Sequence, residues 1–591
     1  MDEKTDPGQP PKKKRRGARL LLGISLMGLL TLGAAAVGVI FVAQDGGLAG
    51  LGGGGGKAEG FLEVSIEPGL ADAPGETGLS LDPKDFPPLV TEVASDIRHA
   101  AEDPDITGLY LEVTGADVGW ASLQEIRDAI VAFSASGKPC YAYGDAYDNK
   151  AYFLASACSQ IYLAPAGVML VNGFSITTEY YAGTFEKVGV RANFEHVGDF
   201  KSAVEPFERP GPSEAASAAV DGLLDSLYGQ MVAGIAAGRK LDPEVVRAIV
   251  DDPPITPEQA LAAKLVDGLK YRDEVRDGLA GEERTTLGEY RPDGGNPFGG
   301  GKKIVVVHAE GSIISGESGN PVFGGSFVGD RSFAEMLEDV RDDEDVVAVV
   351  LRVNSPGGSG LASDNMWREL QRVRTGGKPV VVSMGDYAAS GGYYIATASD
   401  RIVAEPGTLT GSIGVFGGKL NFGGMFEKIG VTTHTWQRGQ LAGLFSGTSD
   451  FSDAERAKFR SFLETFYETF LGRVAEGRKL SRDEVHAVAQ GRVWTGEQAL
   501  GHKLVDELGG LDVAIARARE LAGVGAEEEV TLERLPRRRT FLDQLLDDMQ
   551  SAEAPAVLAE LRPTFARLEA LARVLDGGGV AAVMPVAIEI R

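Results

Sequence analysis

One serine of this sequence could act as a nucleophile, and it belongs to a segment that occurs twice. The segment GDYAASGGYYIATASDRIVAEP (385–406) holds Ser390 between two alanines and two glycines. A second segment of the same length, GDAYDNKAYFLASACSQIYLAP (144–165), carries Asn149 at that position. A serine hydroxyl is a weak nucleophile and needs a positioned base, so the chain must also supply one.

A lysine from the other copy of the duplicated sequence is the candidate base, because the six histidines form no triad pattern. Lys201 lies among apolar residues in GDFKSAVEPF, whereas the matching stretch GQLAGLFSG carries Ala442. Burial disfavours the charged form of a lysine, so a buried Lys201 could accept the serine proton. The second copy keeps the serine and the first copy keeps the lysine, a division that random drift would not be expected to produce.

A glycine turn found only in the second copy could stabilise the oxyanion of an acyl-transfer intermediate. The turn SPGGSG, which begins at Ser355, faces TGADVGW in the first copy, which is one residue shorter there. The backbone N–H groups of Gly357 and Gly358 are oxyanion candidates. The N–H of Gly391, next to the serine at a predicted helix N-terminus, is a third candidate.

Hydroxyl side chains in TGSIG, at Thr410 and Ser412, could orient Lys201, because the matching stretch MLVNG lacks them. Each of these features also has a purely structural interpretation: a serine before two glycines can cap a helix, a lone lysine can be a solvated charge, and S-P-G-G can be only a turn. Ala388 stands where G-x-S-x-G has its first glycine, which argues against an α/β-hydrolase elbow.

These segments belong to two copies of one domain. FEKVGV (185–190) matches FEKIGV (426–431), and several other stretches recur at a nearly constant offset of about 240 residues. Near-continuous apolar stretches such as Val346–Val353 alternate with helix-like stretches such as Asp364–Arg374. This alternation predicts an α/β fold with buried, mainly parallel sheets.

The N-terminus reads as a membrane anchor. The uncharged stretch Leu20–Ala43 is long enough to cross a hydrocarbon core of ~30 Å and follows the basic KKKRR. It continues past its alanines, so an uncleaved anchor is favoured over a cleaved signal peptide. The positive-inside rule then places the N-terminus in the cytoplasm and the rest outside. The predicted organisation is a basic tail (1–19), a transmembrane anchor (20–43), a Gly-rich tether (44–60), an N-terminal repeat (61–290), a linker (291–301), a C-terminal repeat (302–525) and a C-terminal helical tail (526–591).

Composition excludes some partners. A formal net charge of −27 argues against binding to nucleic acid, because a phosphate backbone would be repelled. The two cysteines, Cys140 and Cys158, form no zinc-spaced set with the histidines, so no metal is expected. The favoured prediction is two buried free thiols. A single disulfide between them remains an alternative if the domain lies outside the cytoplasm.

At these residues the chain resembles the signal peptide peptidase A (protease IV) family in its long, two-repeat bacterial form. The resemblance rests on DYAASGGYYIA with Ser390, GDFKSAVEPF with Lys201, SPGG and TGSIGV, and it covers the anchor and both repeats. It implies a Clp-protease/crotonase-like fold and a Ser/Lys dyad without metal or cofactor. It also implies a homo-oligomer, a tetramer, on the outer face of the bacterial inner membrane, acting on signal peptides and other apolar peptides.

We therefore expect a membrane-anchored serine endopeptidase, and two other functions stay open. A crotonase-type acyl-CoA enzyme could use the same superfold and oxyanion glycines, although CoA thioesters are cytoplasmic and the topology is outward. A non-catalytic membrane scaffold would leave Ser390 as a helix cap.

Overall fold

The computed structural model describes residues 59–75, 86–279, 283–290, 301–319, 326–525, 528–538 and 581–583. The predicted basic tail, the transmembrane anchor and nearly all of the tether and linker lie outside these residues. No helix within the described ranges combines the length and the apolar character needed to cross a bilayer.

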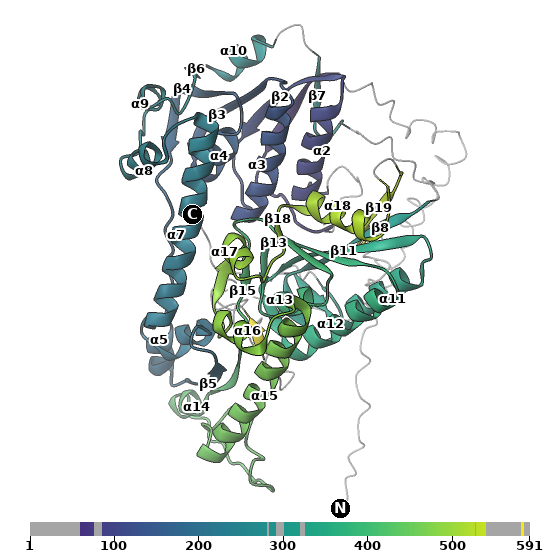
Figure 1. The fold of residues 1–591 in the computed structure, drawn as a ribbon. Coiled ribbons are helices and arrows are strands. Elements are labelled where there is room, and N and C mark those ends of the chain that lie inside the picture. Colours follow the sequence, from purple (N-terminus) through teal and green to yellow (C-terminus); the bar gives the residue numbers. More distant parts are fainter. Residues whose placement is uncertain are drawn as a thin grey trace, which may run out of the picture. The chain divides into compact units, whose positions relative to one another are not determined.

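The first repeat is built on a six-stranded sheet whose strands all pair in parallel, in the order β6-β4-β3-β2-β1-β7. Helices α2 and α3 pack side by side along it (Figure 1). The strand β2 is buried at nearly every position, as a parallel sheet covered on both faces requires. The elements are β1 (Gly60–Ile66), α2 (Val90–Glu102), β2 (Ile106–Val113), α3 (Trp120–Ala135), β3 (Cys140–Asp148), α4 (Asn149–Ala155), β4 (Gln160–Leu170), β6 (Gly268–Leu269), α10 (Arg272–Asp277) and β7 (Arg284–Thr286).

The second repeat has a matching sheet in the order β17-β15-β13-β11-β8-β19, and β14 and β18 pair beside β13. All of its pairings are parallel except that of β15 with β17, so the predicted α/β class with mainly parallel sheets is confirmed. The elements are β8 (Lys303–Glu310), α11 (Asp330–Asp342), β11 (Val346–Ser355), α12 (Gly360–Thr375), β13 (Val380–Ala389), α13 (Gly391–Ala396), β14 (Arg401–Ala404), β15 (Leu409–Gly411), β17 (Val493–Thr495), β18 (Glu507–Leu508), α18 (Leu511–Leu521) and β19 (Thr531–Leu535).

A third sheet joins the two repeats. Strand β5 (Arg191–Val197) of the first repeat pairs antiparallel, along its whole length, with β16 (Val415–Asn421) of the second. This pairing brings the segment after β5, which contains Lys201, to the second repeat. The other strands of this sheet are β9 (Ser312–Ile314), β10 (Phe327–Gly329), β12 (Gly357–Ser359) and β20 (Ala581–Val583).

Helices also cross between the repeats. The long helices α7 (Glu214–Arg239) and α15 (Asp453–Arg478) each have 26 residues and occupy matching positions in the two repeats. Helix α7 contacts β17 of the second repeat, and α15 contacts β5 of the first. The remaining helices are α5 (Ala182–Val188), η3 (Ser202–Val204), α6 (Glu205–Glu208), α8 (Pro243–Asp251), α9 (Pro257–Ala262), α14 (Gly423–Lys428), α16 (Arg482–Val488) and α17 (Gly496–Gly501).

Two predictions are wrong. Cys140 and Cys158 form a disulfide rather than free thiols, with Cα atoms 4.9 Å apart. The Ser159 hydroxyl bonds both the N–H and the C=O of Cys140, which holds the turn after α4 against the start of β3. The C-terminal tail is not helical where it is described, because β19 pairs with the edge of β8 and β20 pairs with β12. An exposed sheet edge offers unpaired backbone groups, and these strands satisfy them.

Candidate active site

The serine and the lysine singled out in the sequence meet in the structure. The Nζ atom of Lys201 donates a hydrogen bond of 2.8 Å to Oγ of Ser390, across a sequence separation of 189 residues. Both side chains are fully buried. A lysine from the first repeat and a serine from the second are thus in hydrogen-bond contact within a single chain.

The backbone around Lys201 is held directly by the second repeat. After β5 the chain turns at Gly198 (φ 107°), and the N–H of Phe200 donates to the C=O of Gln490 at 2.9 Å. A Cβ atom on Gly491 would lie 2.6 Å from Cβ of Lys201. Only glycine at 491 therefore leaves room for the lysine backbone at this point.

The surroundings of Lys201 favour its neutral form. Its Nζ atom also bonds the C=O of Ser412 at 3.1 Å and the hydroxyl of Ser412 at 2.9 Å. Burial lowers the pKa of Lys201 well below its ordinary 10.5. A neutral amine at this distance can take the proton of Ser390. Of the two hydroxyls considered for orienting the lysine, Ser412 lies in contact, whereas Thr410 donates to the C=O of Ala388 at 2.7 Å.

Ser390 lies at a sharp junction between β13 and α13. Its backbone has φ 54° and ψ −113°, and its N–H donates to the C=O of Gly411 at 2.8 Å. A non-glycine residue in such a region costs about 1–3 kcal/mol and is concentrated at functional sites. Ser390 precedes the helix, but its side chain makes no capping hydrogen bond. The hydroxyl faces Lys201 instead.

Two of the three oxyanion candidates lie side by side. Gly391 opens α13, so its N–H has no acceptor within the helix. A Cβ atom on Gly391 would lie 3.1 Å from the nitrogen of Gly358, so the two backbones are adjacent. The N–H of Gly357 donates instead to the hydroxyl of Ser355 at 3.1 Å. Gly358 and Gly391 are thus the two oxyanion candidates whose backbones are adjacent.

An extended segment of the chain's own tail lies beside this site. Strand β20 pairs antiparallel with all three residues of β12, and Ala581 also pairs with Phe416 of β16. β12 contains the oxyanion candidate Gly358, and β16 begins three residues after Ser412. β20 thus lies between β12 and β16 as an added strand.

The matching position of the first repeat is closed. Oδ1 of Asn149 accepts from the N–H groups of Asn172 and Gly173 at 3.0 and 3.1 Å, and its Nδ2 donates to the C=O of Gly173. Lys150 donates to the C=O of Val118 at 2.7 Å, in the stretch that matches the glycine turn. This copy holds a structural amide where the other holds the serine.

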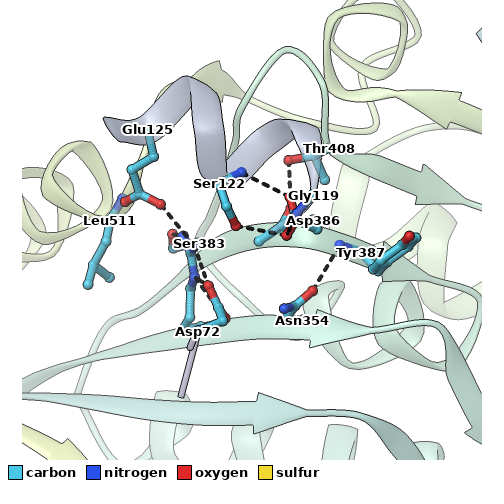
Figure 2. Close-up of polar contacts among 12 residues, drawn as sticks. Asp72, Gly119, Ser122, Glu125, Asn354, Ser383, Asp386, Tyr387, Thr408 and Leu511 are labelled. Atoms are coloured by element: carbon cyan, nitrogen blue, oxygen red, sulfur yellow. Dashed lines mark hydrogen bonds and ion pairs between the residues drawn. The ribbon is translucent and has the colours of Figure 1, made fainter. Parts of the chain in front are cut away.

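Sequence reasoning missed a buried ion-pair cluster between the repeats. Arg352 of β11 is 1% exposed and bonds Asp72 at 2.6 Å and Glu125 at 2.9 Å, both from the first repeat. It also donates to the hydroxyl of Ser383 at 2.9 Å. Figure 2 shows Asp72, Glu125 and Ser383 converging on one place. The one available signal was an arginine within the apolar strand VVAVVLRVNS.

Two stretches of the chain, residues 132–285 and 372–525, match peptidase family S49. Protease 4 of Salmonella typhi is 37% identical over 479 residues, which cover 78% of this chain and 75% of that protein. The chain belongs to peptidase family S49. It is therefore a serine peptidase built from two tandem S49 repeats, which confirms the predicted family and enzyme class.

Two other relatives support the same placement. Serine protease SPPA, chloroplastic, of Arabidopsis thaliana is 33% identical over 476 residues, covering 78% of this chain and 70% of that one. A protein named putative signal peptide peptidase SppA, from Enterococcus faecium, is 36% identical over 209 residues, covering 35% of this chain and 60% of that one. The acyl-CoA and scaffold alternatives find no support in these relatives.

A structural match to ClpP1 from Listeria monocytogenes covers 34% of this chain and 89% of that chain, with 16% identity and a TM-score of 0.21. Because that score is low, the α/β assignment rests on the parallel sheets described above.

Proposed function

We propose that this S49 peptidase is a membrane-anchored endopeptidase that cleaves apolar peptides, including released signal peptides, with Ser390 as nucleophile and Lys201 as general base. The observation that carries the proposal is the 2.8 Å contact between a fully buried amine and the hydroxyl of Ser390. Nothing in this step requires a metal or a cofactor.

The geometry supports a complete reaction cycle. Neutral Lys201 takes the Oγ proton as Ser390 attacks the peptide carbonyl, and the N–H groups of Gly358 and Gly391 stabilise the oxyanion. The resulting ammonium group donates its proton to the leaving amine. In the second half, Lys201 activates a water molecule that hydrolyses the acyl-enzyme, and the proton returns to Ser390. The hydroxyl and C=O of Ser412 hold Nζ throughout.

The proposed substrate is an unfolded apolar peptide in extended form. The pairing of β20 with β12 supports a strand-addition mode, which folded proteins could not use. Leu361, two residues after β12, is 63% exposed and offers an apolar surface there. A signal peptide supplies a leucine- and alanine-rich segment of this kind, and the name of the Enterococcus faecium relative points the same way.

The proposed location is a bacterial inner membrane, with one pass through residues 20–43, the N-terminus in the cytoplasm and the catalytic part outside. The Cys140–Cys158 disulfide supports this topology, because disulfides persist mainly in oxidising compartments. A protease-protection assay with a tag at Arg591 should show external access, whereas a mature protein starting near Gln44 would contradict the anchor.

We also propose a homo-oligomer, a tetramer by family resemblance. The second-repeat stretch that matches β5, residues 432–438, forms no strand with any part of the chain that the structure describes. All of its residues are exposed, and Trp436 is 85% exposed. By analogy with the β5–β16 pairing, a second copy would cover this stretch. This interface is tested by measuring the oligomer mass of the detergent-solubilised wild type and of Trp436→Glu. We expect the variant to form a smaller oligomer, and an unchanged oligomer mass would contradict the proposed interface.

The decisive test of the proposed function is hydrolysis of apolar and polar peptide libraries by the wild type and by Ser390→Ala. We expect preferential cleavage of apolar peptides, no cleavage by the variant, and labelling of the wild type alone by an active-site serine probe. Equal cleavage of both libraries would refute the substrate class, and an active Ser390→Ala would refute the nucleophile.

A further inference from the structure

A carboxylate of the second repeat caps a helix of the first. Helix α3 begins after Gly119, which has no side chain with which to cap it. Asp386 of β13 accepts from the N–H of Gly119 at 3.0 Å, from the N–H of Ser122 at 2.9 Å and from the hydroxyl of Ser122 at 2.8 Å. Figure 2 shows these three contacts on one carboxylate. Anionic groups are stabilised at a helix N-terminus by free N–H groups and the helix dipole.

The sequence around this contact is shaped to admit it. A Cβ atom on Gly119 would lie 2.3 Å from Cγ of Asp386, so no other residue fits at 119 without displacing the carboxylate. The matching helix of the second repeat, α12, is capped by its own Ser359, whose hydroxyl accepts from the N–H of Ala362. The counterpart of Asp386 in the first repeat is Asp145, which is exposed and accepts a hydrogen bond from the hydroxyl of Tyr143, two residues before it in the same strand.

Asp386 lies in the irregular part of the strand that leads to the nucleophile. In the pairing of β11 with β13, Val353 is opposite Met384 and Ser355 is opposite Ala388, so residues 385–387 form a bulge opposite Asn354. Bulges next to active sites redirect the residues that follow them. Ser390 comes four residues after Asp386, directly beyond the end of β13.

Other bonds hold the same bulge from within the second repeat. Asn354 accepts from the N–H of Tyr387 at 3.1 Å, and Thr408 donates to the C=O of Gly385 at 2.9 Å. Asp386 adds three hydrogen bonds from this bulge to the first repeat. The lysine has a separate attachment, through the pairing of β5 with β16 and the contact of Phe200 with Gln490.

We propose that Asp386 is a positioning residue for Ser390: by capping α3 it anchors the bulge to the first repeat and aims the serine hydroxyl at Lys201. The inference rests on the proposed role of Ser390 as the nucleophile. Asp386 acts on the serine side of the dyad only, because Lys201 is held elsewhere.

The first test is Asp386→Ala, measured as kcat, KM and the pH profile of peptide hydrolysis. We expect kcat to fall about 10- to 100-fold, the scale of a misplacement of about 1 Å at a reacting group. KM and the midpoint of the rise in activity with pH should stay unchanged, because the substitution alters neither the pairing of the substrate nor the burial of Lys201. Asp386→Asn keeps an acceptor oxygen and should recover part of kcat. Asp145→Ala, the matched control in the first repeat, should leave kcat within twofold.

The second test leaves the catalytic repeat intact. Gly119→Ala places a methyl group against the Asp386 carboxylate and should lower kcat by a similar factor, again at constant KM and midpoint. Gly229→Ala, a glycine on α7 with open space around it, is its control. If both Asp386→Ala and Gly119→Ala keep kcat within twofold, or if they lose activity only through a higher KM or a lower melting temperature, the proposal is wrong. An inactive Ser390→Ala beside a fully active Asp386→Ala overturns only this inference, whereas an active Ser390→Ala overturns the proposed function.

Discussion

Replacing Lys201 by methionine removes the amine while keeping an unbranched side chain in the same buried site. The variant loses the bonds from Nζ to Oγ of Ser390 and to the hydroxyl and C=O of Ser412, at 2.8, 2.9 and 3.1 Å. Positioned general bases contribute about 10²- to 10⁴-fold to rate. We expect kcat/KM to fall about 10³-fold, equivalent to about 4 kcal/mol of transition-state stabilisation.

The same substitution changes how stability depends on pH. Burial holds the pKa of Lys201 below 10.5, its value in the unfolded chain. Between the folded pKa and 10.5 the unfolded chain binds a proton that the folded chain does not, so wild-type stability rises with pH across this window. The slope contributed by one such group is about 1.4 kcal/mol per pH unit. Lys201→Met should lack this contribution.

Two assays measure these effects: peptide hydrolysis, and denaturant unfolding at a series of pH values from neutral to alkaline. Wild-type hydrolysis should rise with pH as Lys201 loses its proton, with a midpoint below 10.5. Lys201→Arg should be as inactive as Lys201→Met, because a guanidinium stays protonated. Hydrolysis by Lys201→Met within tenfold of the wild type would show that another residue is the base. An unchanged slope of stability against pH would show that Lys201 is not buried as a neutral amine.

Three further outcomes follow from the same geometry. Ser412→Ala removes one of the two hydrogen bonds that Ser412 accepts from Lys201 and should lower kcat about tenfold at constant KM, as expected for a lost hydrogen bond of about 1.4 kcal/mol. Steady-state kinetics measures this change, and an unchanged kcat would contradict it. Asn149→Ser should create no second nucleophile, so an active-site serine probe should not label the double variant with Ser390→Ala. Its free energy of unfolding should fall by about 1–3 kcal/mol, because the N–H groups of Asn172 and Gly173 lose their acceptor. A chain ending at Gly579 lacks β20 and should bind short apolar peptides with a lower KM, whereas an equal KM would show that β20 does not compete with substrate.

The sequence alone was enough for the features that depend on local pattern or on comparing the two copies. A continuous apolar stretch predicted β11 because a strand buried on both faces must be apolar throughout. Ser390 and Lys201 emerged because each copy serves as a reference for the other, and each of these positions carries a reactive side chain in one copy and an inert one in the other. The glycine turn was found in the same way.

Other features required the tertiary structure, because they depend on which distant surfaces are buried together. Nothing local to β5 specifies β16 as its partner, although that pairing is what carries Lys201 to Ser390. Thr410 and Ser412 look equivalent in sequence, but the positive φ of Gly411 and Ser412 breaks the strand, so that one hydroxyl faces β13 and the other faces the lysine.

Charged residues illustrate the same limit. In the sequence, Asp386 looks like an ordinary surface carboxylate. In the structure it accepts a hydrogen bond from the N–H of Ser122, which is 264 residues away in the sequence. Arg352, inside an apolar strand, signalled a buried charge but not its partners Asp72 and Glu125. Short-range periodicity determines which elements form, whereas the pairing of buried polar groups is decided only when the two repeats pack against each other, because each group must then find a partner on the surface opposite it.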